Sequence, residues 1–503
     1  MATRVSIATG NFTAAATWGL VDASTANTTN SELASTLLTT TYVVGTTFTP
    51  GALTITHIGV KLATRSGTTG TMSIALDQGG ATVAGTEVVI NTADLPLATA
   101  GDLDGGWIFL KLASPVTLLA ATLYGVKAKT SSSSQVTLFT SSGSNWSRLL
   151  VLNTTGAPAA GDDLIVAKEY TGAGTSNSFT VTMDNTASTD FGSTPTAANA
   201  LIHPGVAIGS GGTLTWGTTA STNYLLKVSN SIVIYSGGTM NMGTTGTPCP
   251  RTSTMRLTFD CGTNVDYGLT VRKLGAWNAQ GLSRTSGKDI YYCKLNTDEA
   301  IASTSLGVDT DTGWLDNDVI CVGTTTRVIT QSETGALNGA AGASTLTVDG
   351  FAGAGGGLAA AHSGTSPLAA YIIMTTRNVK IYGASASLCA YINIRDTATV
   401  DCDWVEMYWL GSNTSTKRGV GIAVTTGTCS FHYCSRHSST SSGSMGFLLS
   451  GASGSGVTIS NNVIYEVVNG ISVTATSGVS TITNNIIMKG SAVHFECADS
   501  GST

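Results

Sequence analysis

The clearest hydrophobic pattern lies between Val457 and Gly490, where one short motif occurs twice. Thr458–Tyr465 reads TISNNVIY, and Thr481–Met488 reads TITNNIIM 23 residues later. Each copy places an Asn pair between two short runs rich in β-branched residues, which favour strands. Repetition at this period is typical of successive coils in a right-handed parallel β-helix, where each coil buries its apolar face against the next. Two coils cannot form a core alone, so we expect further coils before them.

Similar strand-like runs predict where those earlier coils begin. The candidate starts are Val379, Val400, Ser430, Ile459 and Ile482. Their uneven spacing is consistent with coils that differ in loop length. The pairs Asn461/Asn462 and Asn484/Asn485 are predicted to stack as an amide ladder, with each side chain bonding the next coil. We interpret that role as structural and not catalytic.

The first third of the chain alternates apolar and polar residues with the period of a half-buried strand. The alternating or strand-like runs are Leu53–Leu62, Met72–Leu76, Trp107–Leu112, Leu123–Ala128 and Val136–Phe139. Turn-rich clusters such as Ser66–Gly70 separate these runs. Short strands at this spacing predict a jelly-roll-like β-sandwich over residues 31–152.

The remaining stretches complete an all-β domain plan. Residues 1–30 are predicted to be an anchoring segment, with the alternative that Phe12 and Trp18 belong to an edge strand and enter the first core. Residues 153–200 are predicted to be a bridging β segment. Residues 201–376 are predicted to form a glycine-rich β domain that caps the helix, and residues 377–503 the parallel β-helix. The abrupt end at Thr503 leaves room for further coils beyond it.

Composition and net charge limit the classes of partner that the chain is expected to bind. Charged residues make up 11% of the 503 residues, and the net charge is −6. The average charged fraction is about a quarter, so Ser, Thr, Asn and Gly must cover the surface. A chain without a basic patch is not expected to bind nucleic acid. No apolar run approaches the roughly 18 residues of a membrane span, and MATRVSIATG lacks the apolar core of a signal peptide.

The cysteines indicate a reducing folding compartment. All nine lie in the second half of the chain, at Cys249, Cys261, Cys293, Cys321, Cys389, Cys402, Cys429, Cys434 and Cys497. Their number is odd, no CxxC pair occurs, and several sit inside strand-like runs. We therefore favour buried free thiols over a disulfide framework. We therefore expect a protein that folds in the cytoplasm without a signal peptide but has the hydroxyl-rich surface of an extracellular protein. This combination fits a phage virion component released by lysis.

Two short motifs in the first half resemble those of known proteins. Gly10–Thr13 and Ala16–Gly19 resemble the opening of many phage minor structural proteins. Ser114–Leu118, followed by Thr122–Val126, resembles a carbohydrate-binding-type sandwich found in phage and bacterial surface proteins. That fold hosts both glycan binders and inert spacers, so it does not fix a function. We favour a spacer or assembly module here over a glycan binder.

A third resemblance covers roughly residues 200–385. The stretches that carry it are Gly211–Trp216, Ser236–Gly243, Gly313–Ile320 and Thr376–Gly383. Their order resembles the domain named for its eight glycines, found at the start of β-helices in some hyaluronan-binding and hyaluronan-degrading cell-surface proteins. The resemblance implies a glycine-rich domain that leads into the helix.

The best candidate for chemistry is a group of polar residues in the predicted helix. In Val400–Trp404, alternation buries the first, third and fifth residues and leaves Asp401 and Asp403 on the outer face. His432 is expected beside them on the next coil. Parallel β-helix glycosidases and lyases place paired carboxylates on such a face, one as acid and one as base. Asp401, Asp403 and His432 are therefore the candidate catalytic residues.

Four neighbouring residues are candidate substrate-binding groups: Glu406, Tyr408, Trp409 and Arg436. The two aromatic residues could stack on sugar rings. The alternative, which we favour, is a solvated polar face without chemistry.

Asp309–Gly313 resembles the start of a calcium loop. Ile320 stands at the position where such a loop has its distal Glu, so we interpret the motif as a turn. No metal or cofactor is predicted.

These patterns together predict a structural component of a bacteriophage virion, as a head fibre, tail fibre or tailspike. Such a chain projects from the particle, where it can bind host surface glycans. The expected partners are other virion proteins, further copies of the chain and a host-surface polysaccharide. The predicted localisation is the virion, assembled in the host cytoplasm and exposed outside the cell. The alternatives are a polysaccharide hydrolase or lyase, less favoured than a protein without enzymatic activity, and a bacterial surface adhesin.

Overall fold

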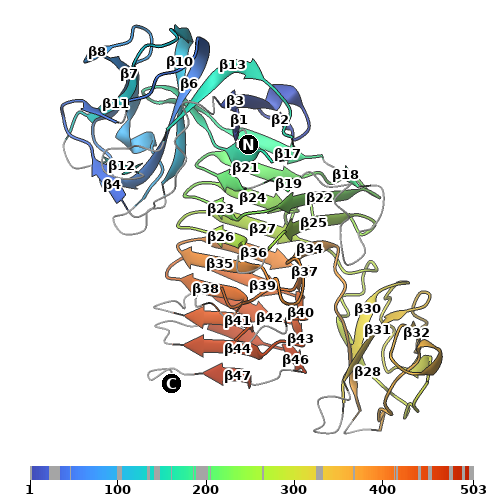
Figure 1. Cartoon of the computed structure of the whole chain (residues 1–503). Coiled ribbons are helices and arrows are strands. Elements are labelled where there is room, and N and C mark those ends of the chain that lie inside the picture. Colours follow the sequence, from blue (N-terminus) through green and yellow to red (C-terminus); the bar gives the residue numbers. More distant parts are fainter. Residues whose placement is uncertain are drawn as a thin grey trace.

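A computed structural model of the chain shows a stack of parallel β-coils joined to two antiparallel units (Figure 1). The structure describes residues 3–21, 34–45, 47–98, 105–132, 136–140, 148–159, 161–184, 186–187, 202–203, 205–262, 266–324, 332–365, 369–412, 414, 417–439, 443–450, 456–474, 480–489 and 493–497. Within these ranges the helical elements are short 3-10 turns, namely η1 (Ala15–Thr17), η2 (Thr92–Asp94) and η4 (Ala354–Gly356). The predicted all-β fold class is confirmed.

Three parallel sheets form the walls of the β-helix. The first sheet contains β14 (Asp163–Val166), β20 (Val206–Ile208), β23 (Ile232–Ile234), β26 (Gly268–Val271), β35 (Tyr391–Asp396), β38 (Val420–Val424), β41 (Met445–Ser450), β44 (Asn469–Thr474) and β47 (Val493–Cys497). The second contains β17 (Phe179–Met183), β21 (Gly212–Trp216), β24 (Thr239–Met242), β27 (Ala276–Gln280), β36 (Thr399–Asp403), β39 (Thr428–His432), β42 (Val457–Ser460) and β45 (Ser480–Thr483). The third contains β22 (Asn223–Val228), β25 (Thr254–Phe259), β34 (Val379–Tyr382), β37 (Val405–Tyr408), β40 (Ser435–His437), β43 (Val463–Tyr465) and β46 (Ile486–Met488), with the short strands β18 (Thr186–Ala187) and β19 (Ile202–His203) beside β22.

The sequence repeat aligns with the coils residue for residue. Thr458 of β42 pairs with Thr481 of β45, and Tyr465 of β43 pairs with Met488 of β46. Inward side chains of successive coils, such as Cys402, Phe431 and Ile459 in the second sheet, stack in one continuous apolar core. Each coil therefore buries its apolar face against its neighbours, as the repeat predicted.

The corner between the second and third sheets explains the Asn pairs. A residue with left-handed backbone occupies this corner in successive coils: Trp404, Tyr433, Asn461 and Asn484, with φ between 49° and 58°. Asn tolerates this conformation better than most residues. The second Asn of each pair forms the predicted amide ladder, in which Asn462 Nδ2 donates to Asn485 Oδ1 at 2.9 Å. In each pair, the first Asn therefore occupies the corner and the second forms the ladder.

The helix begins earlier than the predicted boundary at residue 377. Strand β14 already pairs in parallel with β20, and β20 with β23. Much of the predicted glycine-rich domain is therefore helix coils, because the runs between 206 and 280 add strands to all three walls. The predicted coil starts Val400, Ser430, Ile459 and Ile482 all lie in the second sheet, whereas Val379 lies in the third and so marks a different point of its coil. Residues 188–200 of the predicted bridge and 498–503 of the predicted helix lie outside the described residues.

Two sheets enclose a separate core at the N-terminal end of the helix, in the unit that we call the sandwich (blue in Figure 1), and their strands pair antiparallel except for β10 with β15. One sheet contains β4 (Ala34–Leu37), β6 (Leu53–Arg65), β10 (Gly106–Leu118), β12 (Val136–Thr140), β13 (Arg148–Thr155), β15 (Glu169–Gly172) and β16 (Thr175–Asn177). The other contains β5 (Val43–Val44), β7 (Thr71–Gln78), β8 (Ala81–Thr82), β9 (Val88–Asn91) and β11 (Gly125–Thr130). Buried Glu169 of β15 pairs with His57 Nε2 of β6 at 2.7 Å and with Lys111 Nζ of β10 at 3.0 Å, so these ion pairs hold β15 within the sandwich sheet.

The N-terminal segment closes the top of the helix. Strand β1 (Thr3–Ser6) pairs with β14 and with β3 (Trp18–Val21), while β2 (Gly10–Asn11) pairs with β17. Phe12 and Trp18 are buried in the helix core, and the Trp18 indole N–H donates to the Phe12 carbonyl at 2.8 Å. Both aromatic residues therefore contribute to a core, that of the helix, while the anchoring role of the segment stays a prediction. Residues 22–30 of the predicted anchoring segment lie outside the described residues.

A third unit, which we call the insertion, interrupts the helix between β27 and β34 (yellow in Figure 1). Its antiparallel strands are β28 (Tyr292–Lys294), β29 (Ser305–Gly307), β30 (Val319–Val322), β31 (Glu333–Leu337), β32 (Thr345–Asp349) and β33 (Tyr371–Met374). Its core also contains Trp404, Val463 and Tyr465 of the helix, and Thr334 donates to the Tyr465 hydroxyl at 2.8 Å. The insertion is therefore packed against the corner of the coils below its own attachment.

The cysteines agree with the prediction of buried thiols. Eight of them, from Cys249 to Cys434, are free and buried. Burial raises the pKa of Cys249 and of Cys434 to about 12, so these thiols stay protonated and unreactive near neutral pH. Reduced cysteines in the core are consistent with folding in a reducing compartment.

Candidate functional site: two faces at one corner of the helix

The second sheet brings the predicted catalytic residues together. Asp401 and Asp403 alternate with buried Val400 and Cys402 along β36, so both carboxyl groups lie on the outer face. Strand β39 pairs with β36 in a register that places His432 opposite Asp403. The neighbourhood predicted from the alternation is thus present, whereas its catalytic role remains a prediction.

The two carboxyl groups differ in their hydrogen bonds. Ser430 Oγ donates to Asp401 Oδ1 at 3.0 Å, and Thr245 Oγ1 approaches Asp401 Oδ2 at 3.4 Å. Asp403 Oδ1 is shielded from solvent, yet no described residue provides it with a hydrogen bond. His432 Nδ1 shares a hydrogen bond of 2.5 Å with Ser460 Oγ of the following coil. Asp403 is therefore the least satisfied group on this face.

The surroundings of Asp403 raise its pKa and so favour its protonated form. Burial raises the pKa of Asp403 to about 7, and the negative charges of Asp401 and Asp289 act in the same direction. The backbone N–H of Trp404 and the Arg377 guanidinium oppose this shift but do not cancel it. A carboxyl group with a pKa near neutrality can both hold and release a proton, as a general acid must.

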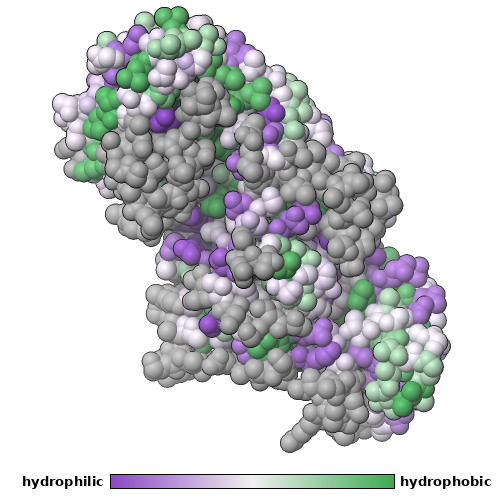
Figure 2. All heavy atoms as spheres, in the orientation of Figure 1, coloured by the Kyte–Doolittle hydropathy of each residue, from purple (hydrophilic) through white to green (hydrophobic). Residues whose placement is uncertain are grey.

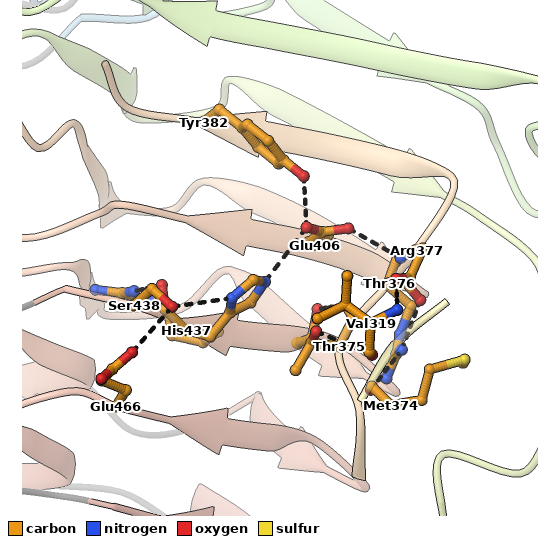
Figure 3. A network of polar contacts seen from close by, with 12 residues as sticks. Val319, Met374, Thr375, Thr376, Arg377, Tyr382, Glu406, His437, Ser438 and Glu466 are labelled. Atoms are coloured by element: carbon orange, nitrogen blue, oxygen red, sulfur yellow. Dashed lines mark hydrogen bonds and ion pairs between the residues drawn. The ribbon is translucent and has the colours of Figure 1, made fainter. Parts of the chain in front are cut away.

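Around the corner, the third sheet presents a different carboxyl environment (Figure 3). Glu406 of β37 accepts a hydrogen bond from the Tyr382 hydroxyl at 2.5 Å and pairs with His437 Nε2 at 3.3 Å. Its second oxygen accepts the Arg377 backbone N–H at 3.1 Å. Burial alone would raise the pKa of Glu406, but Lys380, His437 and Tyr382 lower it to about 2. Glu406 is thus a buried, fully paired anion, and its role in substrate binding stays a prediction.

Arg436, another predicted substrate-binding residue, does not lie on the outer face. Its side chain is fully buried inside the helix, in the column formed by Met407 and Ile464. It donates to the carbonyl oxygens of Leu410 and His437. The cause is the corner at Tyr433, which resets the alternation so that residue 436 faces inward.

The predicted stacking residues lie on the third sheet and not beside Asp403. The Tyr408 and Trp409 rings are partly exposed and stack on each other, with centroids 4.0 Å apart. The ring of His437 lies 4.6 Å from that of Tyr408. The single site predicted from the sequence therefore divides into an acidic face on the second sheet and an aromatic face on the third.

Sequence reasoning missed Asp289, whose charge raises the pKa of Asp403 from the insertion. No local pattern in the chain could have revealed it, because Asp289 and Asp403 meet only after the insertion folds onto the helix. The prediction of a turn at Asp309–Gly313 agrees with the contacts, since Asp309 accepts the Lys294 backbone N–H and Asp311 pairs with Lys288. Among the described residues, no group of three or more His, Cys, Asp or Glu side chains is arranged to hold a metal ion.

Comparisons with known proteins give little guidance. No family model matches the chain, and no curated protein matches its sequence. A solved structure with similarity to the chain is the Gp54 tailspike of Acinetobacter baumannii bacteriophage AP22, in complex with A. baumannii capsular saccharide. The sequences are 11% identical, the match covers 57% of this chain and 64% of that chain, and the TM-score is 0.17. The chain therefore matches less than two thirds of that tailspike, at a TM-score too low to establish a shared fold.

The resemblance of residues 200–385 to the eight-glycine domain likewise remains a prediction. Within the described part of the chain, no helix is long and apolar enough to cross a membrane.

Proposed function

We propose that this chain is a rigid component of a phage virion, a fibre or tailspike, that binds host-surface polysaccharide along the second sheet of its β-helix. The observation that carries the proposal is the outward row of polar groups on adjacent coils, with Asp401 and Asp403 beside Ser430 and His432. Carboxylate, hydroxyl and imidazole groups at regular spacing suit the repeated hydroxyls of a linear polysaccharide. Stacked coils hold them in fixed positions, which lowers the entropic cost of binding.

The virion part of the proposal draws on the rest of the chain. Buried reduced cysteines and a hydroxyl-rich, weakly charged surface suit a protein that folds in the cytoplasm and then works outside the cell. The remaining expected partners, other virion proteins and further copies of the chain, belong to the same proposal.

Two measurements test it. Peptide mass spectrometry of purified, nuclease-treated phage particles should detect the chain at a stoichiometry typical of a structural protein. The full chain should also bind at least one member of a panel of immobilised bacterial capsular polysaccharides. Absence from intact particles would exclude the virion role and favour the bacterial adhesin, whereas failure to bind any polysaccharide would exclude glycan recognition.

A second candidate function is polysaccharide hydrolysis, and the pKa of about 7 of Asp403 favours it. A protonated Asp403 would donate its proton to the glycosidic oxygen while Asp401 activates a water molecule. Because a strand rises about 3.3 Å per residue, the Cα atoms of Asp401 and Asp403 stand about 6.6 Å apart along β36. Carboxyl groups at a similar separation would leave room for the water of an inverting mechanism.

The test is depolymerisation, followed by size-exclusion chromatography of whichever polysaccharide binds. Asp403→Asn and Asp401→Asn should each lower the rate by at least a hundredfold, the usual contribution of a general acid or base. Asp349→Asn, on the exposed strand β32, is the matched control and should leave the rate unchanged. Activity that survives both site changes would remove this candidate, and complete absence of activity would leave binding as the function.

A further inference from the structure

A row of five aromatic side chains leads from the acidic face onto the insertion. Trp404 stacks on Tyr433 with centroids 4.9 Å apart and planes 8° apart, and Tyr433 meets Tyr291 at 5.5 Å. Tyr291 contacts Tyr292 at 4.9 Å, and Tyr292 contacts Tyr371 at 5.6 Å. We call these residues the aromatic row. Its members come from β28 and the residue before it, from β33 and from two corners of the helix, so only the packed insertion assembles it.

The row begins at the acidic face and ends on the surface. Trp404 directly follows Asp403, and Tyr433 directly follows His432. Trp404 and Tyr291 are buried and Tyr433 is partly buried, whereas the outer two rings are open: Tyr292 is 36% and Tyr371 is 40% exposed. In Figure 2 the insertion is one of the regions where hydrophobic residues reach the surface. The row therefore connects the candidate site to an exposed aromatic pair.

Neighbouring groups fix the rings in place. The Arg377 guanidinium lies 4.9 Å from the Trp404 ring centroid, and Lys294 Nζ lies 4.8 Å from that of Tyr371. The Tyr291 hydroxyl donates to the Asn484 carbonyl at 3.0 Å. Cations over both ends and a hydrogen bond near the middle hold the row without a ligand, so binding would cost little additional ordering.

We propose that Tyr292 and Tyr371 form an additional binding subsite for polysaccharide, which extends the site of the second sheet onto the insertion. This inference rests on the proposed function, because it concerns how the same polymer is held. The C–H face of a sugar ring would pack on the exposed tyrosine rings, while their hydroxyls and Lys294 would bind the polar edge. The ligand class is thus a polysaccharide long enough to reach from Asp401 and Asp403 to Tyr371, and not a short oligosaccharide.

The surface suits a sugar chain better than a protein partner. On β28, β30 and β33 the exposed large hydrophobic residues within the described part are Tyr292, Tyr371 and Val319, which do not form a broad apolar patch. Protein interfaces of standard size bury about 800 Å² on each partner, around an apolar centre. Two tyrosines that continue a polar face instead suit a narrow polymer.

The experiment compares polysaccharide fragments of increasing length. A capsular polysaccharide that binds the full chain is cleaved by mild acid and sorted by size, and each fraction is titrated against the wild type and the double variant Tyr292→Ala/Tyr371→Ala. We expect the double variant to bind long fragments about tenfold more weakly, the combined effect of two aromatic contacts. Its affinity for the shortest fragments that bind should be unchanged.

The matched control is Tyr391→Ala. Tyr391 is a partly exposed tyrosine on the first sheet whose ring lies 5.5 Å from Lys417 Nζ, so the variant removes a similar pair from a different face. It should bind fragments of every length as the wild type does. The subsite is rejected if the affinity for long fragments falls equally in the control and the double variant, or does not fall in the double variant. Either result leaves the proposed function intact.

A second measurement on the wild-type chain does not depend on any variant. Polysaccharide at saturating concentration should slow the nitration of Tyr292 and Tyr371 by tetranitromethane, but not that of Tyr391, as read by peptide mass spectrometry. Unchanged nitration of the pair while the polymer is bound overturns the subsite. If the wild type binds no polysaccharide at all, the proposed function and the subsite are rejected together.

Discussion

Asp403 and Glu406 lie three residues apart, on two faces of the same corner, and their acidities differ widely. Both carboxyl groups lose much of their hydration, a loss that by itself raises the pKa of each. The pKa of Asp403 is about 7, whereas that of Glu406 is about 2. Trp404, with φ of 54°, turns the chain between them. The corner thus separates two opposite electrostatic environments.

The difference arises from the neighbours and not from the degree of burial. Glu406 is surrounded by groups that stabilise its anion, namely Lys380, His437 and the Tyr382 hydroxyl. Asp403 faces two further acids and has an oxygen without a hydrogen bond from any described residue. In a medium of low dielectric constant, paired charges rigidify a structure, while unpaired ones store free energy that chemistry can use. We therefore interpret Glu406 as structural and Asp403 as the group available for function.

The largest expected effect is that of removing the paired acid. Glu406→Ala should lower the free energy of unfolding by about 3–5 kcal/mol, because it leaves buried cationic and hydroxyl partners without their acceptor. Urea denaturation followed by tryptophan fluorescence measures the change. Glu466→Ala is the control, because Glu466 pairs with Lys489 at 2.9 Å in a more exposed position and should cost less than about 1 kcal/mol. Equal losses would contradict the structural role of Glu406.

Removing the unpaired acid should have the opposite sign. Because the pKa of folded Asp403 is about 7 and its ordinary value is 3.8, the folded state binds more protons than the unfolded state between these values. Stability is therefore lost as the pH rises through this window. Asp403→Asn removes that loss and should stabilise the chain by up to about 4 kcal/mol at pH 8, at about 1.4 kcal/mol per pKa unit, with little effect near pH 4.

Urea denaturation at both pH values measures this difference, with Asp349→Asn as the control. A stability difference between wild type and Asp403→Asn that does not change with pH would show that the pKa of Asp403 is not raised.

A smaller effect is expected when one partner of Glu406 is lost. The pKa of folded Glu406 lies near 2, below its ordinary 4.5, so the stability it contributes is present above pH 4.5 and is lost as the pH falls towards 2. Lys380→Met should raise that pKa by about one unit, or about 1.4 kcal/mol. Acid unfolding should then begin at a higher pH.

The matched control for this change is Lys227→Met, on the same sheet, where Lys227 pairs with the more exposed Asp260 at 3.0 Å. An acid transition that moves as far in the control as in Lys380→Met would show that the shift does not come from Glu406.

The smallest effect on stability should come from removing the Ser430 hydroxyl, which donates a hydrogen bond to Asp401 on the acidic face. Ser430→Ala removes the 3.0 Å hydrogen bond to Asp401, and water can replace it because both residues are partly exposed. We expect a loss of about 0.5–1 kcal/mol in the free energy of unfolding. A loss above about 2 kcal/mol would mean that the acidic face, like the Glu406 network, is held together by buried bonds.

Much of the acidic face could be predicted from the sequence. Alternation in Val400–Trp404 placed Asp401 and Asp403 outward, and the apolar positions around His432 set the register of the next coil. The prediction did not extend past the corner. A residue with positive φ resets the alternation, so Arg436 turned inward and Glu406 entered a buried network on another wall. A corner at Trp404 or Tyr433 leaves no clear signal in the residue type.

The insertion shows the same limit on a larger scale. Its strands have the same short apolar runs as the coils, so local patterns placed residues 281–376 in one glycine-rich domain together with the coils that precede them. The earlier coils between 206 and 280 were likewise assigned to a separate domain. Parallel coils and antiparallel strands both need alternating residues, and only pairing across long sequence distances distinguishes them.

The sequence by itself determined the all-β class, the coil repeat after Val457, the buried thiols and the outward position of the two aspartates. These properties follow from periodicity and residue type, which act over a few neighbouring residues. Only the tertiary structure decided that Asp403 holds a proton while Glu406 does not, and that five aromatic rings form a row beside them. Both depend on Asp289, Lys380 and the insertion, which come close only when distant segments pack together, because electrostatic and ring contacts act through space and not along the chain.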